Sequence, residues 1–315
     1  MRILQSLCGW DNVTQKVMPA LSDPEMSHSL LGTARAIADR GRPWRACQFL
    51  LAALLHFPVW RRWRAVLEKE LRDLPEAVRF ALRPRPFRPY LRRRFGPAAR
   101  VGIITRHYRQ LLARRPQDYT EFLAYPGVTL ARLPGKSGKA YCVQMALNRS
   151  KEGEVDLFLW EEGTRAGLAL LAGVLGEEHG QLVFYVGGLR GVKPPLGKPE
   201  IVAATRDLHG LRPKAAVLQA TRCVAQALGA GRLVLPGLRN HVSQLPGFES
   251  RVIHADYDGF WLECGATPRV DGDYDLPVQM PRRDPAEVKS SKRAEWLRRQ
   301  ALLDDLARQI GERLG

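Results

Sequence analysis

The sequence predicts an α+β protein in which a helical N-terminal region precedes a mixed, mainly antiparallel sheet packed with helices. Two observations support this. Apolar residues recur at helical spacing before residue 115, and strand-like runs separated by glycine turns follow residue 127. Of the 315 residues, 45% are hydrophobic, enough for one large domain or two ordinary ones. We expect a basic helical region over residues 1–115 and an α+β domain over residues 116–315.

Helical patterns dominate the first part of the chain. Residues 27–38 begin with serines and are predicted as a helix, and residues 44–73 as one or two more. Four prolines between residues 75 and 89 interrupt any longer helix, so residues 83–91 are predicted as an extended linker or brace. Residues 100–112 return to helical spacing, with His107 beside the apolar stripe.

Strand patterns then dominate as far as residue 187, where we expect a meander of about five antiparallel strands joined by short turns. The predicted strands are residues 128–133, 141–147, 155–160, 167–174 and 182–187. Helices are predicted over residues 200–208 and 214–228, with Pro213 in the first turn and Gly229 at the end of the second. A strand at 232–235 and a last helix over about 285–314 complete a mixed sheet.

Positive charge is concentrated in one stretch of the chain. The formal net charge is +17, and residues 60–115 contain 17 Lys or Arg against four acids. Such a field attracts an anionic ligand, an anionic membrane surface or nucleic acid. A solvated face that keeps the protein soluble is the alternative explanation.

Cysteine usage and the N-terminus indicate a cytoplasmic protein. The five cysteines are an odd number at wide spacings without a CxxC pair, which argues against a disulfide framework and against a zinc site. No secretory signal is recognised. The apolar segment 47–60 is too short to span a bilayer. It is either a buried helix or an interfacial helix with Trp60 and Trp63 at lipid headgroups, which would make the protein peripheral on the inner membrane.

Four segments carry a family resemblance. They are Val186-Gly-Gly-Leu-Arg-Gly191, Thr205-Arg-Asp-Leu-His-Gly-Leu-Arg-Pro-Lys214, Asp256-Tyr-Asp-Gly-Phe-Trp-Leu-Glu263, and a group between residues 276 and 299 that ends Lys292-Arg-Ala-Glu-Trp-Leu-Arg-Arg299. In order and spacing, from about Pro86 onward, the chain resembles the VirK/YbjX family of Gram-negative bacteria. Arg190 stands where that pattern has glutamine, and Gly265-Ala266 replaces a double glycine. The resemblance implies a role in virulence, envelope integrity or tolerance of antimicrobial peptides, without implying a reaction.

The predicted element order also resembles the acetyltransferase (GNAT) fold, which implies an acyl thioester such as acyl-CoA as cofactor. In that fold, strand backbone and a helix N-terminus hold the pyrophosphate. The anion-binding residues expected here are Gly188, Arg190, Gly191, Arg212, Lys214, Lys292 and Arg293, and Lys193 and Lys198 also lie near the glycines. A strand end or bulge explains the same glycines without a ligand, and a balanced surface helix explains the last cations.

Three residues are the candidate catalytic groups: His209 as general base, and Asp258 and Glu263 as acids beside aromatic rings. An ordinary turn histidine and a helix cap at Asp258 are the alternatives. His107 and Tyr108 form a further candidate pair.

Three functions stay open from the sequence. They are an envelope-associated acyltransferase-like protein, a non-enzymatic basic factor that binds anionic lipid or glycolipid, and a nucleic-acid-binding protein. No Walker phosphate loop, HExxH or GxSxG is present, and no metal is expected. The pattern leaves open whether the protein is an enzyme.

Overall fold

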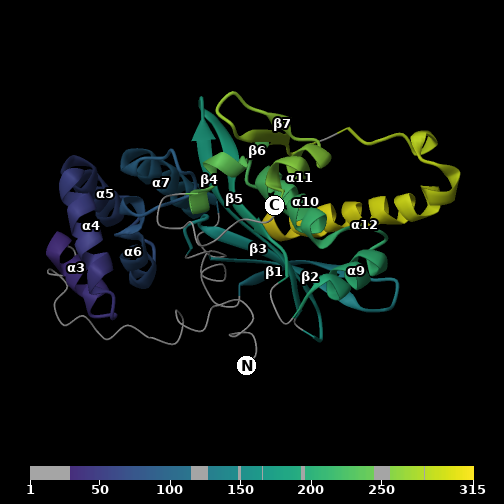
Figure 1. Ribbon diagram of the computed structural model, residues 1–315, viewed down its shortest axis with the longest axis horizontal. Coiled ribbons are helices and arrows are strands. Elements are labelled where there is room, and N and C mark those ends of the chain that lie inside the picture. Colours follow the sequence, from purple (N-terminus) through teal and green to yellow (C-terminus); the bar gives the residue numbers. More distant parts are fainter. Residues whose placement is uncertain are drawn as a thin grey trace.

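Helices pack on both faces of a single eight-stranded sheet (Figure 1). The computed structural model describes residues 29–114, 127–147, 150–164, 166–192, 196–244, 256–279 and 281–315. The strand order is β1-β2-β3-β4-β5-β6-β8-β7. The predicted α+β class is therefore confirmed.

The N-terminal region is helical, as predicted. Its elements are α3 (Leu30–Ala38), α4 (Pro43–Leu55), α5 (Phe57–Lys69), α6 (Glu76–Leu82), the 3₁₀ turn η1 (Arg85–Phe87) and α7 (Pro97–Arg114). Ser29 begins α3 because its hydroxyl accepts the Gly32 N–H at 2.9 Å. Pro58 lies in the first turn of α5, where its missing N–H costs nothing, so the apolar segment divides into two helices at His56.

The first five strands form the predicted antiparallel meander. They are β1 (Val128–Pro134), β2 (Ala140–Leu147), β3 (Val155–Glu161), β4 (Ala166–Glu178) and β5 (Gln181–Arg190). Strand β6 (Arg232–Leu235) then pairs parallel to β5, after a crossover through α9 (Lys198–Asp207) and α10 (Pro213–Ala227). Pro213 and Gly229 hold the positions expected of them at the two ends of α10.

The C-terminal part departs from the prediction at two places. The short strands β7 (Thr267–Pro268) and β8 (Tyr274–Pro277) extend the sheet beyond β6 and were not predicted. Helix α11 (Tyr257–Glu263) precedes them. The last helix, α12 (Ser290–Leu314), begins later than expected because residues 285–287 form the 3₁₀ turn η4 (Pro285–Glu287). The 3₁₀ turns η2 (Leu238–Asn240) and η3 (Val242–Gln244) follow β6.

Alternate residues of the sheet supply two cores. Phe184 and Val186 of β5 pack on the face that carries α10 and α12, whereas Val183 and Tyr185 pack on the face of α4–α7. Trp60 and Trp63 belong to the second core and are 3% and 0% exposed. The alternative that places these two rings at lipid headgroups is therefore wrong. Among the described residues, every helix is too short or too polar to cross a bilayer.

The proline-rich segment is a buried brace rather than an open linker, and its end carries the side chain of Arg92 into the sheet. Parallel pairing of β5 and β6 stops at Tyr185 and Val234. The Arg92 guanidinium lies at that point, donating to the carbonyls of Val186 at 2.6 Å and Val234 at 2.9 Å. It is fully buried and pairs with Asp273, also buried, at 2.8 Å. Arg92 therefore fills the place where the two strands part.

The Arg92–Asp273 pair is one end of a larger ion-pair network that crosses the β6–β8–β7 edge of the sheet. Arg94 pairs with Asp271 at 2.7 Å and with Asp273 at 3.2 Å. The network continues through Arg269 and Arg232 to Asp275 and Glu178. Four arginines face four carboxylates in it. Arg92 and Arg94 are thus neutralised within the protein, although the sequence places them in its densest cationic run.

Removing the counter-charge of Arg92 tests this arrangement. Asp273→Asn keeps the side-chain shape but leaves a buried guanidinium unpaired, which typically costs about 3–5 kcal/mol. We expect the free energy of unfolding, measured in urea, to fall by about that amount. The control is Asp304→Asn, because Asp304 pairs with Arg282 at the surface, where a pair contributes about 0–1 kcal/mol. Equal small losses in both variants would contradict the role assigned to Arg92.

Candidate functional site

Beyond Arg92, strand β5 continues without β6 as a neighbour and bulges at Gly187. The pairing with β4 shifts there, since Gly173 faces Val186 while Ala172 faces Gly188. A Cβ on Gly188 would lie 2.6 Å from the Glu152 carboxylate oxygen Oε2, and one on Gly187 would collide with the Glu152 carbonyl. Gly187 therefore requires glycine because the backbone at Glu152 packs directly on the strand, whereas a Cβ on Gly188 would displace the Glu152 carboxylate.

A buried polar centre surrounds this bulge. Glu152, which is 7% exposed, accepts hydrogen bonds from the guanidinium of Arg190. His241, which is 3% exposed, accepts the Ser243 N–H on Nδ1 at 3.1 Å, so its proton lies on Nε2. That Nε2 has no hydrogen-bond partner among the described residues and lies 3.4 Å from the Cβ position of Gly188. Burial and the nearby arginines lower the pKa of His241 to about 4, so the ring is neutral at pH 7.

Side chains of α11 fill the rest of the opening between β5 and β6. The Tyr257 hydroxyl donates to the Leu189 carbonyl at 2.7 Å and accepts the Leu189 N–H at 3.1 Å, so it satisfies the free edge of β5. Trp261 is fully buried and donates to the Pro236 carbonyl at 2.9 Å. A ligand strand or a thioester would use the N–H and carbonyl of Leu189. The Tyr257 hydroxyl already bonds to both groups.

The three expected catalytic residues lie in different surroundings. His209 occupies the turn between α9 and α10 with a φ of 54°, and burial together with Lys136 and Arg298 lowers its pKa. Asp258 accepts the Leu238 N–H at 3.0 Å, and Glu263 pairs with Arg212 at 2.7 Å. Hydrogen bonds and ion pairs in the described parts of the chain join none of His209, Asp258 and Glu263 to another.

The cap of α11 differs from the alternative considered for Asp258. Asp256 begins that helix, because its carboxylate accepts the Gly259 N–H at 2.9 Å. Asp258 lies in the first turn instead.

The structure brings some of the expected anion-binding residues together and separates others. Lys214 reaches the end of β5, where its Cε is 3.4 Å from the Cβ position of Gly191. Burial and the charge of Arg212 lower the pKa of Lys214. Arg293 instead donates to the carbonyls of Pro285 and Val288, and Lys292 is exposed on the first turn of α12. Lys193 lies outside the described residues.

His107 and Tyr108 connect α7 to the sheet. Pairing between β3 and β4 ends at Gly173. Strand β4 continues beyond Gly173, and its N–H groups on the β3 side have no strand partner there. His107 is buried and its Nδ1 accepts the Leu175 N–H at 3.3 Å, while Tyr108 donates to buried Glu154 at 2.8 Å. Burial and the charge of Arg85 lower the pKa of His107 to about 3. Both side chains thus hold two elements together.

The low pKa of His107 predicts acid sensitivity. Since an unfolded histidine titrates near 6.5, the unfolded state takes up a proton below that pH that the folded state does not. The contribution of neutral His107 to the free energy of unfolding is complete above pH 6.5. It is lost as the pH falls below that value, by about 1.4 kcal/mol per pH unit. In His107→Gln an amide oxygen can accept the Leu175 N–H without titrating.

We therefore expect the free energy of unfolding to fall less between about pH 7.5 and 5.5 in His107→Gln than in the unchanged protein. Urea titrations at the two pH values measure this difference. His56→Gln, the same substitution at an exposed histidine, is measured beside it as the control. An identical pH dependence in His107→Gln would refute the assignment.

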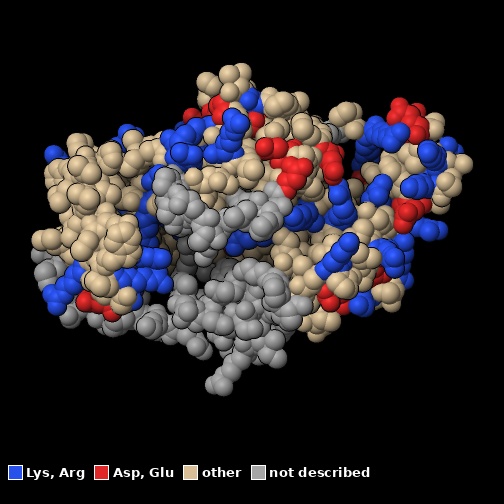
Figure 2. Space-filling model, viewed as in Figure 1, with Lys and Arg blue, Asp and Glu red and all other residues tan. Residues whose placement is uncertain are grey.

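Helix α4 exposes a second, apolar candidate site. It buries only Ala46, Phe49 and Ala53, whereas Trp44, Leu51 and Leu55 repeat along the opposite side at helical spacing. Exposed large apolar side chains gather here: Leu31 72%, Trp44 66%, Leu51 62%, Leu54 60%, Leu55 72% and Phe57 47%. Figure 2 shows a broad uncharged area, rimmed with basic side chains, at the α3–α5 end of the molecule. We call Trp44, Leu51, Leu54, Leu55 and Phe57 the apolar face.

Arginines border the apolar face. Residues 29–69, which include all of α5, contain seven arginines and Lys69 against two acids, Asp39 and Glu68, and Glu68 pairs with Arg64. Arg61 and Arg62 are exposed at the start of α5. Burial and the charges of Arg45, Arg42, Arg85 and Arg40 lower the pKa of Arg88 to about 10. This end of the molecule therefore combines exposed apolar surface with an excess of positive charge.

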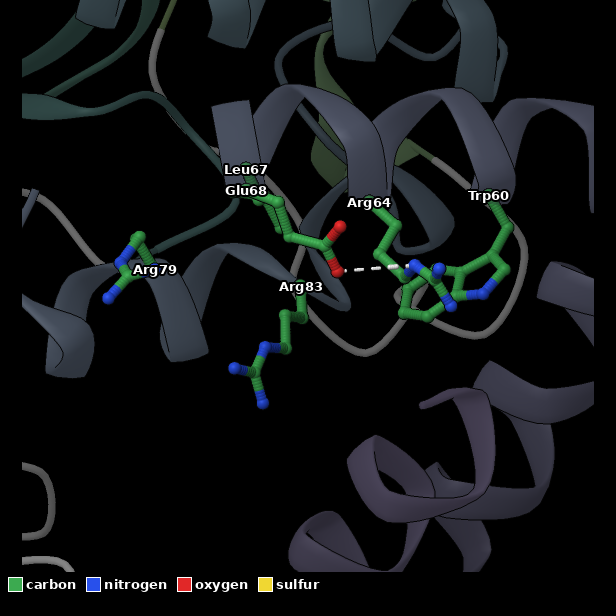
Figure 3. Close-up of a pocket in the computed structure, with 6 residues that line it drawn as sticks. All are labelled: Trp60, Arg64, Leu67, Glu68, Arg79 and Arg83. Carbon is green, nitrogen blue, oxygen red and sulfur yellow. Dashed lines mark ion pairs between the residues drawn. The ribbon is translucent and has the colours of Figure 1, made fainter. Parts of the chain in front are cut away.

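A small pocket lies behind these helices and is lined by Trp60, Arg64, Leu67, Glu68, Arg79 and Arg83 (Figure 3). The ion pair of Arg64 with Glu68, 3.2 Å long, crosses one side of it. Its volume of about 10 Å³ is room for about one water molecule. We assign no ligand to this pocket. In the described part of the chain, no group of three or more His, Cys, Asp or Glu is arranged to hold a metal ion.

Comparison with known proteins identifies the family. A family model described as "Protein of unknown function (DUF535)" matches residues 39–312. The chain belongs to the DUF535 family. It is 29% identical over 312 residues to the uncharacterized protein YbjX of Escherichia coli (strain K12), covering 95% of this chain and 94% of that protein. The resemblance inferred from the four segments is thereby confirmed, and the DUF535 match extends it toward the N-terminus to include α4 and α5.

Two further similarities are more limited. An uncharacterized protein of Haemophilus influenzae is 31% identical over 121 residues, which cover 38% of this DUF535 chain and 40% of that protein. A solved cAMP-binding acyltransferase from Mycobacterium smegmatis aligns with a TM-score of 0.30 and 11% identity over 65% of this chain and 60% of that one. A score this low does not support a fold assignment.

Sequence reasoning missed most of both sites. Glu152 and His241 lie outside regular strands and helices and reach Gly188 only through the fold. The apolar face had a usable signal, because α4 is apolar on both sides and a helix of this kind is either fully buried or covered by something else. The interfacial-helix alternative for residues 47–60 used this signal, but it placed Trp60 and Trp63 at the headgroups, and both side chains are buried.

Proposed function

We propose that this DUF535 protein is a peripheral membrane factor that docks on anionic lipid through the α3–α5 end. The observation that carries the proposal is the apolar face of α4, exposed near Arg42, Arg45 and Arg88, which make no ion pair with a residue that the structure describes. Apolar side chains of an interfacial helix enter the boundary between headgroups and acyl chains while basic residues meet the anionic headgroups. Both requirements are met by neighbouring residues of the same helices.

Chemistry favours lipid over the other anionic partners. Nucleic-acid interfaces are polar and cationic, and a row of exposed leucines contributes little to phosphate contacts. A lipid surface uses both kinds of side chain, since burying one leucine contributes about 1.5–3 kcal/mol and each nearby basic residue about 1 kcal/mol. The exposed apolar residues thus stabilise binding to a membrane, whereas their exposure to water is unfavourable.

Vesicle sedimentation tests the docking. The protein is expected to bind phosphatidylglycerol-containing vesicles more tightly than phosphatidylcholine vesicles and to dissociate as salt is raised. Leu51→Gln with Leu55→Gln should weaken binding at least about tenfold, because two apolar side chains no longer enter the lipid. The control, Leu262→Gln with Leu297→Gln, removes two leucines that are similarly exposed on α11 and α12 and should bind normally.

Two results would reject the proposal. One is binding to neither vesicle type. The other is a dimer in lipid-free solution that dissociates in the Leu51→Gln, Leu55→Gln variant, which would show that a second copy covers the apolar face. Light scattering with size exclusion measures the oligomeric state in both variants.

Acyl transfer at the opening beyond the β5–β6 pairing is a second candidate. It is favoured by the parting of the parallel strands after Tyr185, because the backbone of β5 beyond that point has no strand neighbour on the β6 side. An acyl thioester in this opening would pair with the backbone of Leu189, which the Tyr257 hydroxyl occupies. The neutral His241 would present its Nε2–H to a developing oxyanion.

Calorimetric titration with acetyl-CoA tests the second candidate. Tyr257→Phe removes the competing hydroxyl and should raise the affinity, whereas Arg190→Gln removes a cation at the end of β5 and should lower it by about tenfold. Absence of binding to both the unchanged protein and Tyr257→Phe would reject acyl transfer at this place. The lipid proposal is independent of that result.

A further inference from the structure

Three arginines lie near the N-terminal turn of α4, close enough for the charges of two of them to act on the third. Arg42 is the residue before the helix, Arg45 lies in its first turn, and Arg88 ends the turn η1 that packs against the same helix. The packing is fixed by Phe49 and Phe87, whose rings meet edge to face at 5.9 Å. No side-chain hydrogen bond or ion pair joins Arg42, Arg45 or Arg88 to any residue that the structure describes. Asp39, the only acid between residues 29 and 67, also makes no ion pair with them.

This arrangement is unfavourable in the free protein for two reasons. Arg42 and Arg45 lie at the positive end of the α4 dipole, where acidic or neutral capping side chains are favoured, and Arg42 forms no cap. Arg88 is also partly buried among like charges, which lowers its pKa to about 10. A bound anion would relieve both penalties at once.

We propose that Arg42, Arg45 and Arg88 together bind one phosphate group, presented by the headgroup of an anionic phospholipid. The phosphate chemistry rests on the three arginines, while its lipid source rests on the docking proposed above. A guanidinium offers several N–H donors in a plane that matches two phosphate oxygens. Three of them supply more donors than a single carboxylate accepts, whereas a phosphate monoester accepts several hydrogen bonds on each of three oxygens.

The position of Arg42 and Arg45, the two exposed arginines of the three, agrees with a membrane source. Trp44, the exposed aromatic residue of the apolar face, lies between Arg42 and Arg45 in the chain. Tryptophan is enriched where headgroups meet acyl chains. With Trp44 at that depth, the first turn of α4 is held at the level of the lipid phosphates, and the leucines further along α4 point to the acyl chains.

Two lipids of equal charge separate phosphate recognition from simple charge attraction. Vesicles containing phosphatidic acid are compared with vesicles containing the carboxylate lipid dioleoylglycerol succinate at matched surface potential. We expect about tenfold tighter binding to phosphatidic acid, and we expect Arg88→Gln to abolish that preference. Arg206→Gln on α9 is the control, because Arg206 is an exposed arginine without an ion pair and its loss removes the same charge elsewhere.

Thermal unfolding shows whether the Arg88→Gln variant is folded. Because Arg88 is surrounded by like charges, Arg88→Gln should unfold at the same temperature as the unchanged protein or higher in phosphate-free buffer. Inorganic phosphate should then raise the unfolding temperature of the unchanged protein and of Arg206→Gln, but not of Arg88→Gln. The same series with sulfate or chloride separates phosphate binding from ionic strength.

The outcomes distinguish this inference from the docking proposal. Equal binding to both lipids, unaffected by Arg88→Gln, overturns the phosphate site and leaves docking by charge and apolar contact. No vesicle binding, with stabilisation by phosphate that Arg88→Gln removes, supports the site and overturns the lipid as its source. Failure of both assays overturns the inference entirely.

Discussion

The buried Arg92–Asp273 pair is the interaction on which the rest of the structure depends. It lies where β5 and β6 stop pairing, so one guanidinium satisfies carbonyls of both strands and holds the brace that leads from the N-terminal helices. Leu91 beside it has a φ of 60°, a conformation that costs about 1–2 kcal/mol in a non-glycine residue. This conformation directs the Arg92 side chain into the protein. It also lets the Leu91 N–H donate to the Lys151 carbonyl at 2.8 Å.

This pair also decides where the positive charge of the molecule acts. Arg92, Arg94, Arg232 and Arg269 form a closed network with four carboxylates, so the edge of the sheet offers little field to a ligand. The α3–α5 end has few acids with which to form such a network, since residues 29–69 contain only Asp39 and Glu68. The surplus therefore acts around α4, although the sequence concentrates its arginines further along the chain. Charge counted along a sequence locates a cationic surface only where the acids nearby in space are also known.

Local patterns predicted the elements but not what joins them. The five-strand meander and the ends of α10 were predictable, because alternation, Pro213 and Gly229 act within a few residues. Strands β7 and β8 were not, since two and four residues carry no period and depend on pairing with β6. Among the candidate site residues, Arg190 ends β5, three residues beyond the predicted strand end at Gly187, and its partner Glu152 is 38 residues away. Asp273 is 181 residues from Arg92, and no local pattern connects two residues so far apart.

The two proposed functions differ in what the folded chain has already satisfied. At the β5 opening, Tyr257 and Arg92 take up the hydrogen-bonding groups that a ligand needs, so binding there requires the protein to give up contacts of its own. At α4, leucines are exposed to water, and arginines of like charge lie close together at the positive end of the helix dipole. Binding there removes penalties instead of breaking contacts. A ligand binds most tightly where the protein has to break the fewest of its own contacts. The α4 end is therefore the stronger candidate for the primary site.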